Sequence, residues 1–386
     1  MHDKELLYIA FKDFSKLHFG ANAKVISQCK VFEKNGFNVH LIGRFNNISA
    51  RIHLDGSCDM FNEVKTPEKN GRIYNLLAKM NQYKAVESYV HDKQFDVCYI
   101  RYDFSDRGFI HLLKIIKLHC KKIILELPTY PYENENSLGF LNKIKMLIDM
   151  HYRKKLKDYI SQIVTFYGGY DTLFGIPVKV IHNGFDFSKM DLVQSELPEN
   201  EIHIIAVSSM REWHGYERMI EGMRLYYSNK AAKEKVFLHL VGNGKCYKQY
   251  SDLATKYHLN DYIIMEGALY GKDLDRLYEK CAIGIDSLAR HRSNIEVLSS
   301  LKSREYGAKG IPMINSCKID IIKDDFPYLL MVPSDESPVN IEDVLKFYHK
   351  CYDNCSRFEL GQRVRSYIQS KSDMSLSLKP LINELI

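Results

Sequence analysis

The regular alternation of short apolar runs with helix-like segments constrains the fold of this chain more than any other feature. Apolar runs such as LLYIAF (6–11), FDVCYIRY (95–102) and KKIILEL (121–127) are separated by amphipathic stretches. The same alternation resumes at IHIIAVSS (202–209) and continues to GIPMIN (310–315). Strand, helix and strand in repeated order are typical of a parallel sheet with helices on both faces.

A polar stretch without a strand pattern, DFSKMDLVQSELPENE (186–201), divides the two series. The length of 386 residues suffices for two domains of about 100–200 residues each. We predict an α/β protein with two Rossmann-like, doubly wound parallel-sheet domains that face each other across a cleft. The predicted domains are 1–190 and 191–365, with a helical tail at 366–386 that packs back on the first domain.

Charge and hydropathy exclude several classes of protein. The net charge is only +6, and the basic residues lie on amphipathic helices. No zinc-finger, RNP or helix-turn-helix pattern is visible, so we expect no nucleic-acid partner. No apolar stretch reaches the roughly 20 residues that a membrane-spanning helix needs, and the opening residues do not resemble a signal peptide. We therefore expect a cytoplasmic protein, soluble or peripheral at the inner face of the membrane.

The basic stretch at 141–158 leaves two interpretations open. Its cations are Lys143, Lys145, Arg153, Lys154, Lys155 and Lys157. Apolar residues lie between them, among them Ile144, Leu147 and Leu156. The stretch is either the solvated face of a surface helix or a face that binds an anionic membrane surface.

The turn Gly242–Asn243–Gly244 follows the apolar run VFLHLV and precedes a helix-like segment. Glycines allow backbone N–H groups to approach an anion, and the start of a helix favours negative charge. Turns of this kind also occur without any ligand. The spaced glycines of a dinucleotide fingerprint and the Gly-Lys-Ser/Thr of a Walker loop are both missing, which argues against a nicotinamide enzyme.

A second joint between a strand and a helix carries Arg211, the only tryptophan Trp213, and His214, followed by Gly215. Ordinary turns use Asn, Asp or Gly at such places. We infer that this joint holds a ligand, and that Trp213 either orients the His214 imidazole or packs into the core.

Glu305 lies among small and apolar residues in the segment LSSLKSREYGAKG (298–310), a predicted helix that Gly310 ends. A buried carboxylate needs a partner, because burying a lone charge is costly. Two partners remain open. One is a cation of the same helix, and the other is the pair of ribose hydroxyls of a nucleotide.

Several of these stretches together resemble family 4 of the GT-B-fold glycosyltransferases, of the bacterial polysaccharide-assembly type. The donor half is VGNGKCYKQYSDLATKYHLNDYIIMEGALYGKDLDRLYEKCAIGI (241–285) followed by LKSREYGAKGIP (301–312). FGANAKVISQCKVFEKNGFNVHLIG (19–43), ILELPTYPYENE (124–135) and FGIPVKVIHNGFDF (174–187) look like the acceptor half. The resemblance implies retaining sugar transfer from a nucleotide-diphosphate donor, without a metal or another cofactor.

The resemblance also assigns residues on the donor side. Glu305 corresponds to the second glutamate of the family's pair, which binds ribose hydroxyls. Gly20 matches a glycine whose backbone faces the donor phosphates. The remaining donor-side candidates are Gly242, Asn243, Gly244 and Lys302.

This sequence departs from the family pattern at the catalytic positions. Val297 occupies the place of the first glutamate, with Glu296 one residue away. Relatives carry Arg and Lys where this chain has Ser209 and His214, and Arg211 lies close enough to replace the arginine. We therefore assign catalytic roles to His214, Arg211 and Glu296. The family's acceptor-side histidine has no equivalent, and the substitutes are Glu126, Thr129 and Tyr130.

The sequence thus predicts a metal-independent hexosyltransferase that uses a nucleotide sugar, with UDP as the expected nucleotide. The expected acceptor is a glycan or a polyprenyl-linked sugar in surface polysaccharide synthesis. The departures leave two alternatives open, a noncatalytic partner subunit of another transferase and a nucleotide-sugar epimerase on the same fold.

Overall fold

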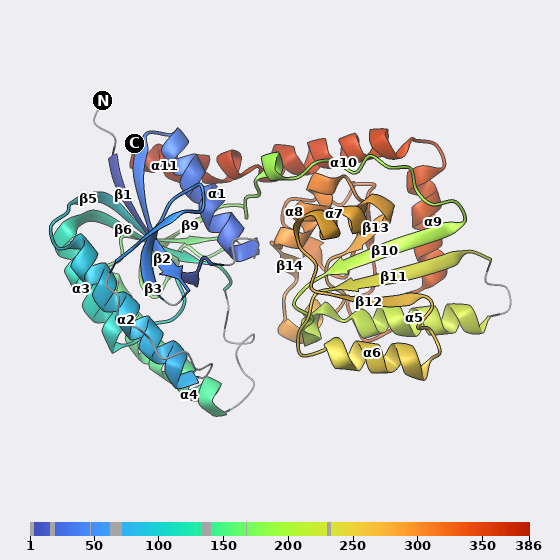
Figure 1. Cartoon of the computed structure of the whole chain (residues 1–386), viewed down its shortest axis with the longest axis horizontal. Coiled ribbons are helices and arrows are strands. Elements are labelled where there is room, and N and C mark those ends of the chain that lie inside the picture. Colours follow the sequence, from blue (N-terminus) through green and yellow to red (C-terminus); the bar gives the residue numbers. More distant parts are fainter. Residues whose placement is uncertain are drawn as a thin grey trace. The chain divides into compact units, whose positions relative to one another are not determined.

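The computed structural model of the chain describes residues 4–15, 20–46, 48–61, 72–130, 132, 140–166, 168–229 and 233–386. The chain forms two compact units; in Figure 1 the first is coloured blue to green with a red last helix, and the second green to red. Unit 1 comprises Met1–Gly184 and Met374–Ile386, and unit 2 comprises Phe185–Asp373. The chain therefore returns to unit 1 for its last helix.

Unit 1 is built on a sheet in the order β4-β3-β2-β1-β5-β6-β7-β9-β8. Its parallel strands are β1 (Lys4–Asp13), β2 (Phe37–Phe45), β5 (Phe95–Arg101), β6 (Cys120–Leu127), β7 (Gln162–Thr165) and β9 (Ile176–Val180). The edge strands β3 (Ile48–Ile52), β4 (Cys58–Met60) and β8 (Thr172–Leu173) run antiparallel. These edge strands were not anticipated from the sequence, because they are short and turn back without a helix.

Each face of this sheet has its own apolar core. Helices α1 (Gly20–Lys34) and α11 (Met374–Leu385) cover one face, with Tyr8 and Tyr99 at its centre. Helices α2 (Arg72–Val90) and α3 (Arg107–His119) cover the other face (Figure 1). The helices lie on both faces because the crossovers are right-handed. A right-handed connection toward one edge of the sheet places its helix on one face, and a connection toward the other edge places its helix on the opposite face.

Unit 2 has a wholly parallel sheet in the order β12-β11-β10-β13-β15-β17. The strands are β10 (Glu201–Val207), β11 (Lys235–Val241), β12 (Ile263–Gly267), β13 (Ile283–Ile285), β15 (Met313–Asn315) and β17 (Leu329–Met331). In chain order this is the 3-2-1-4-5-6 arrangement of a doubly wound fold. A separate pair, β14 (Val297–Leu298) and β16 (Lys318–Ile319), lies outside the main sheet.

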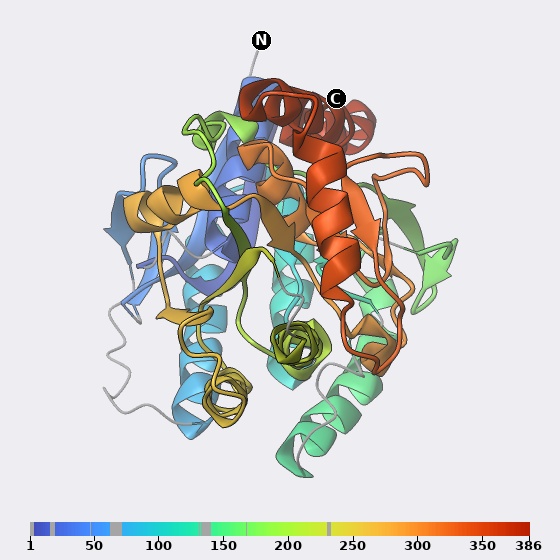
Figure 2. The ribbon, with the colours of Figure 1, turned by 90° about the vertical axis from the view of Figure 1, so that its right-hand side faces the viewer.

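Helices α5 (Tyr216–Ser228) and α6 (Tyr247–Lys256) lie along one side of the unit 2 strands, and α7 (Gly271–Lys280) and α8 (Leu301–Lys309) along the other (Figure 1). Ser300 caps α8, and Gly310 ends it with a φ of 74°, as the sequence predicted. Helix α9 (Ile341–Tyr352) crosses the near side of unit 2 in Figure 2, and α10 (Arg357–Ser372) follows it.

The basic stretch forms α4 (Phe140–Tyr152) and a 3-10 turn at Arg153–Asp158. Two residues that the sequence assigned to an exposed amphipathic face instead point into the protein. Leu156 is fully buried, and Arg153 donates to the Tyr132 hydroxyl at 3.2 Å. Within the described ranges, no helix combines the length and the apolar character needed to cross a bilayer.

Candidate functional site

The strand order of unit 2 reverses between β10 and β13. Open α/β sheets bind ligands beyond the carboxyl ends of the strands at such a switch point. After Val207 ends β10, a 3-10 helix at Glu212–His214 leads into α5. After Ile285 ends β13, another 3-10 helix forms at Arg290–Ser293. These two loops therefore lie where a ligand of unit 2 would bind.

The two loops pack directly on each other. The Leu288 amide donates to the His214 carbonyl at 2.8 Å. Gly215 between them has a φ of 64°, and a Cβ there would lie 2.5 Å from the Ala289 Cβ. Only glycine fits both the left-handed backbone and this contact. The joint seen in the sequence is thus held against the loop that follows β13.

Trp213 supports a cation from that second loop. The Arg290 guanidinium lies over the indole ring, 5.6 Å from its centroid. Such a contact is attractive because the ring face carries negative charge density. Arg290 was not predicted as a site residue, although the basic run ARHR after β13 is a visible signal.

His214 is buried and neutral in this setting. Its Nδ1 accepts a hydrogen bond from the Arg211 amide at 2.9 Å, and its ring stacks on Tyr216. Burial lowers the pKa of the His214 imidazole well below its usual value. Three neighbouring cations lower this pKa further, in the order Lys302, Arg290 and Arg211. The environment thus gives no support to the idea that His214 carries the charge of a replaced lysine.

Lys302 brings a buried cation to the same group from helix α8. Its ammonium lies 3.1 Å from the Asp286 carboxylate and donates to the Asp286 carbonyl at 2.7 Å. Asp286 is fully buried and also accepts from the Ser300 hydroxyl at 2.5 Å. Burial lowers the pKa of Lys302, while Asp286 opposes that effect. The structure therefore groups Arg211, His214 and Lys302 from the predicted set, and adds Arg290.

Glu305 lies one turn further along α8. Its Oε1 accepts from the Tyr278 hydroxyl at 2.9 Å. The cations that could have paired with it have other partners, which are Asp286 for Lys302, Asp320 for Arg304 and Asp275 for Lys309. No ion pair joins Glu305 to any residue that the structure describes. Glu305 therefore does not form, among the described residues, the salt bridge within its own helix that was one of its two expected partnerships.

The Gly242–Gly244 turn has a packing reason for its glycines. A Cβ at Gly242 would lie 1.9 Å from the Ser208 carbonyl oxygen, and one at Gly244 would lie 1.8 Å from that of Ser209. The Gly242 amide donates to Gly267, and the Gly244 amide to the Asn243 side chain. Both amides therefore already donate hydrogen bonds within the chain. The turn holds the β10 and β11 loops together at the candidate site.

Glu296 is not joined to the cation group by any hydrogen bond or ion pair of its side chain among the described residues. It is exposed and lines a cavity of about 580 Å³ with His291, Lys318 and other residues. The adjacent Val297 begins β14, whose pairing with β16 sets the local backbone. Within the described part of the chain, no hydrogen bond or ion pair of the Glu296 side chain reaches the His214 loop.

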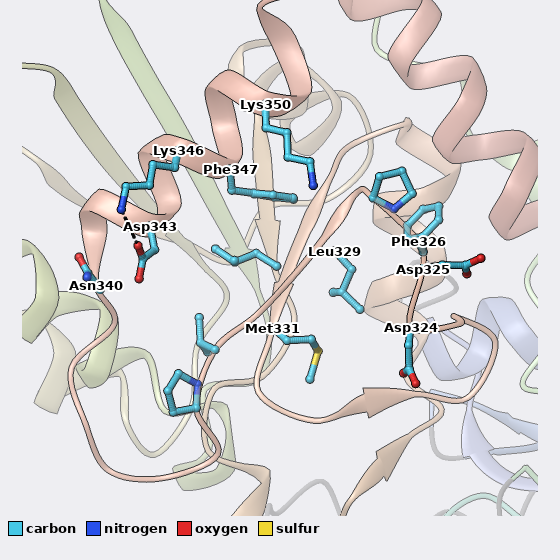
Figure 3. A pocket seen from close by; sticks show the side chains of 14 residues that line it. Asp324, Asp325, Phe326, Leu329, Met331, Asn340, Asp343, Lys346, Phe347 and Lys350 are labelled. Atoms are coloured by element: carbon cyan, nitrogen blue, oxygen red, sulfur yellow. Dashed lines mark hydrogen bonds and ion pairs between the residues drawn. The ribbon is translucent and has the colours of Figure 1, made fainter.

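Another cavity of unit 2 holds none of the predicted site residues. It has a volume of about 650 Å³ and lies between α9 and β17, where Phe347 and Lys350 face Leu329 and Met331 (Figure 3). Lys346 on its rim already pairs with Asp343 at 3.2 Å. The candidate site is therefore located at the switch point between β10 and β13, and not in this cavity.

The acceptor-side candidates belong to unit 1. Glu126 is fully buried and binds Arg101, the Gln28 amide at 2.6 Å and the Tyr99 hydroxyl at 2.8 Å. Although burial raises the pKa of Glu126, these partners and Lys24 lower it overall. Its carboxylate therefore positions Arg101 and has little capacity left for a sugar.

Three further candidates of unit 1 lie at chain turns. Thr129 and Tyr130 follow β6 and are partly exposed. The Tyr130 ring packs against Tyr132 and Tyr170. Gly20 is exposed at the first position of α1. Thr129 and Tyr130 lie on the same edge of the sheet as Glu126.

Comparisons with known proteins agree with this geometry. Residues 189–288 match the family described as Glycosyl transferases group 1. A sucrose-phosphate synthase from Thermosynechococcus elongatus has a similar structure, with a TM-score of 0.74, 13% identity and 99% of each chain covered. HepE from Anabaena, solved with UDP and glucose, gives a TM-score of 0.63 at 14% identity, also over 99% of each chain. No curated protein sequence matches the chain significantly.

A glycosyltransferase from Rickettsia africae ESF-5 is also similar, with a TM-score of 0.64 and 13% identity over 100% of this chain and 98% of that one. At such identities the likeness establishes the fold alone. The fold is GT-B, with two Rossmann-like domains, as predicted. The match at 189–288 confirms the resemblance to group 1 glycosyltransferases.

Proposed function

From the GT-B fold and the group 1 region at 189–288, we propose that this protein is a retaining glycosyltransferase with a UDP-sugar donor. The choice of UDP is supported by HepE, a similar structure that was solved with UDP-glucose. The proposed acceptor is a glycan or a polyprenyl-linked sugar of a surface polysaccharide. A TarM variant from S. aureus, solved with fondaparinux, alpha-GlcNAc-glycerol and UDP, also resembles this chain over 64% of its own length and supports a sugar-containing acceptor.

The grouping of cations at the unit 2 switch point carries this proposal. Arg211, Arg290 and Lys302 surround His214 closely enough to lower its pKa. Asp286 pairs with Lys302 and so offsets one of these three charges. Three cations gathered around one buried carboxylate suit a diphosphate, because positive charge at a site favours the binding of a multiply charged anion.

The proposed chemistry follows from where charge develops during transfer. When the bond between sugar and phosphate breaks, negative charge grows on the leaving diphosphate. Cations that are already in place stabilise this charge, commonly by about 3–4 kcal/mol for each donor. Arg290 and Lys302 are held by Trp213 and Asp286, so they need no reorganisation. In this proposal Glu305 binds the ribose hydroxyls, and no metal is required.

Binding of nucleotides to the purified full-length chain tests the donor assignment. We expect UDP to raise the melting temperature, and UDP-glucose to do so more than GDP or ADP derivatives. Arg290→Gln should weaken UDP binding about tenfold or more, since a hydrogen bond to a charged group contributes about 1.5–3 kcal/mol. Arg276→Gln is the matched control, because Arg276 is an exposed arginine of the same unit that pairs with Asp273 on α7. Equal losses in both variants would contradict the assignment.

A noncatalytic partner subunit is the second candidate function. Two observations favour it, namely the neutral state of His214 and the placement of Val297 in a strand where relatives carry a glutamate. Hydrolysis of UDP-sugar by the purified chain distinguishes the two functions. Product analysis without an acceptor would reveal an epimerase, since an epimerised sugar would then remain attached to the nucleotide.

We further propose that helix α4 binds an anionic membrane surface, which would place the protein at the inner face of the cell membrane. Its exposed apolar side chains include Leu147, at 65% exposure, together with Ile144, Ile148 and Met150. Lys143, Lys145 and Lys154 are exposed on the same stretch. Each basic residue near such a surface contributes about 1 kcal/mol.

Cosedimentation with vesicles tests the membrane proposal. We expect binding to vesicles that contain anionic lipid, little binding to neutral ones, and loss of binding at high salt. Leu147→Glu should abolish the binding, whereas Leu118→Glu, at another exposed apolar residue of unit 1, should not. Equal recovery with both kinds of vesicle would leave α4 as an ordinary solvated helix.

A further inference from the structure

We infer that unit 1 holds an oxyanion site formed by Lys12, Arg44 and Arg101, which binds a phosphate group of the acceptor. This inference rests on the proposed function and deepens it, because it names the chemical class of the acceptor. The site belongs to unit 1 alone and is distinct from the cation group of unit 2.

The three cations emerge at the carboxyl ends of adjacent strands. In the parallel register, Asp13 of β1 is aligned with Arg44 of β2, and Ala10 of β1 with Arg101 of β5. Lys12 therefore lies between the two arginines, on strands that are about 4.8 Å apart. The strand order of unit 1 reverses between β1 and β5, so this is its topological switch point.

Both arginines carry a buried donor without a partner. The Nε atoms of Arg44 and Arg101 are buried and make no hydrogen bond. The Arg101 side chain is only 10% exposed, and its Nη1 is bound to Glu126. Within the described ranges, the Arg44 side chain has neither a hydrogen bond nor an ion pair. Buried donors of this kind are rare and costly, and an oxyanion beyond the strand ends would give such a donor a partner.

The surrounding charges leave this edge of unit 1 positive. Lys79 pairs with Asp103 at 3.1 Å, and Arg101 pairs with Glu126. Burial lowers the pKa of Lys12, and so do Arg101, Arg44 and Lys145, against the opposite effect of Asp103. The cations Lys12, Arg44, Lys79, Arg101 and Lys145 outnumber the neighbouring carboxylates Asp13, Asp103, Asp106 and Glu126, an excess that favours an anion. Two guanidinium groups also match the geometry of phosphate oxygens.

Titration of the full-length chain with inorganic phosphate tests this site by calorimetry. Saturating UDP is present throughout, so that the donor site of unit 2 is filled. We expect the wild type to bind phosphate, and Arg44→Gln and Lys12→Gln each to weaken that binding about tenfold or more. Lys121→Gln is the matched control, since Lys121 pairs with Asp96 at the opposite edge of the sheet. Arg101→Gln is avoided, because it would leave Glu126 buried without its cation.

The outcomes separate this site from the donor proposal. No phosphate binding by the wild type, or equal binding by the wild type and both variants, would overturn the inference. Both variants should keep the wild-type affinity for UDP and the wild-type melting temperature. A chain that fails to bind UDP but binds phosphate through Arg44 would refute the proposed donor and retain the oxyanion site.

Discussion

The Nδ1 atom of His214 accepts a hydrogen bond from the backbone amide of Arg211 at 2.9 Å. An Nδ1 that accepts carries no proton, so the neutral ring must carry its proton on Nε2. Burial and three nearby cations favour the same neutral form. His214 can therefore offer a ligand one hydrogen bond, but it does not offer a charge.

This leads to a prediction about pH. The pKa of His214 is lowered below its usual value of about 6.5, so the ring stays neutral at every pH above that value. We expect the affinity for UDP-glucose, measured between about pH 6.5 and about pH 9, to be independent of His214 titration. His214→Gln should lower the affinity by a similar factor at each pH. An alkaline loss of affinity in the wild type that is absent from His214→Gln would show that the ring is charged in the complex.

A second prediction concerns Glu305. If this carboxylate binds ribose hydroxyls, Glu305→Gln should weaken UDP binding about ten- to hundredfold, because charge-assisted hydrogen bonds contribute about 1.5–3 kcal/mol. Tyr278→Phe is the control, since it removes only the hydroxyl that Glu305 accepts from. It should cost about 1 kcal/mol of stability and keep UDP binding. Should Glu305→Gln lower stability while UDP affinity is retained, Glu305 is a structural residue.

The sequence predicted the features of this molecule that depend on neighbouring residues. The strand and helix order, the capped end of α8 at Gly310 and the exposed basic surface of α4 are local patterns. The stacking of Arg290 on Trp213 was not predictable, because the two residues belong to different loops that meet only in the folded sheet. For the same reason the pattern suggested a ligand for Gly242, where the structure shows the Ser208 backbone.

A third prediction tests the packing role of that glycine. Gly242→Ala would place a Cβ 1.9 Å from the Ser208 carbonyl oxygen, at a φ of 117°. The loops would have to separate, and we expect a loss of about 3 kcal/mol or more, as for other strained backbone sites. Gly267→Ala has a φ of 68° but nothing within 4 Å, so it should cost only about 1–2 kcal/mol.

The measurement for both glycine variants is urea unfolding followed by tryptophan fluorescence. Trp213 is the only tryptophan, so its signal reports on unit 2. Similar losses for the two variants would mean that backbone conformation, rather than the contact with Ser208, accounts for the glycine at 242.

The last prediction concerns two histidines buried between β10 and β11. His203 Nδ1 lies 2.8 Å from His239 Nε2, and His239 Nδ1 lies 2.7 Å from the Glu266 carboxylate. Burial lowers the pKa of His239 to about 4, although Glu266 opposes the effect. Burial likewise lowers the pKa of His203. Both rings are therefore neutral in the folded state near pH 7.

The sign of the pH dependence follows from these shifts. In the unfolded chain each histidine takes up a proton near pH 6.5, roughly its ordinary pKa. The folded chain takes it up only nearer the lowered value, which is about 4 for His239. Between these values only the unfolded state is protonated, so stability falls as pH falls, by up to about 1.4 kcal/mol per pH unit for each proton. Above about pH 6.5, the two histidines do not make the free energy of unfolding depend on pH.

Urea unfolding at about pH 7.5 and pH 5, on either side of the ordinary histidine pKa, tests this behaviour through Trp213 fluorescence. His239→Gln should be less stable than the wild type at pH 7.5, because a buried hydrogen bond is lost. Its stability should then fall less between the two pH values than that of the wild type. His258→Asn is the control, since His258 is exposed and its φ of 55° is one that asparagine tolerates. If His239→Gln loses as much stability on acidification as the wild type and the control, the acid sensitivity of unit 2 arises elsewhere and the neutral histidine pair is not its cause.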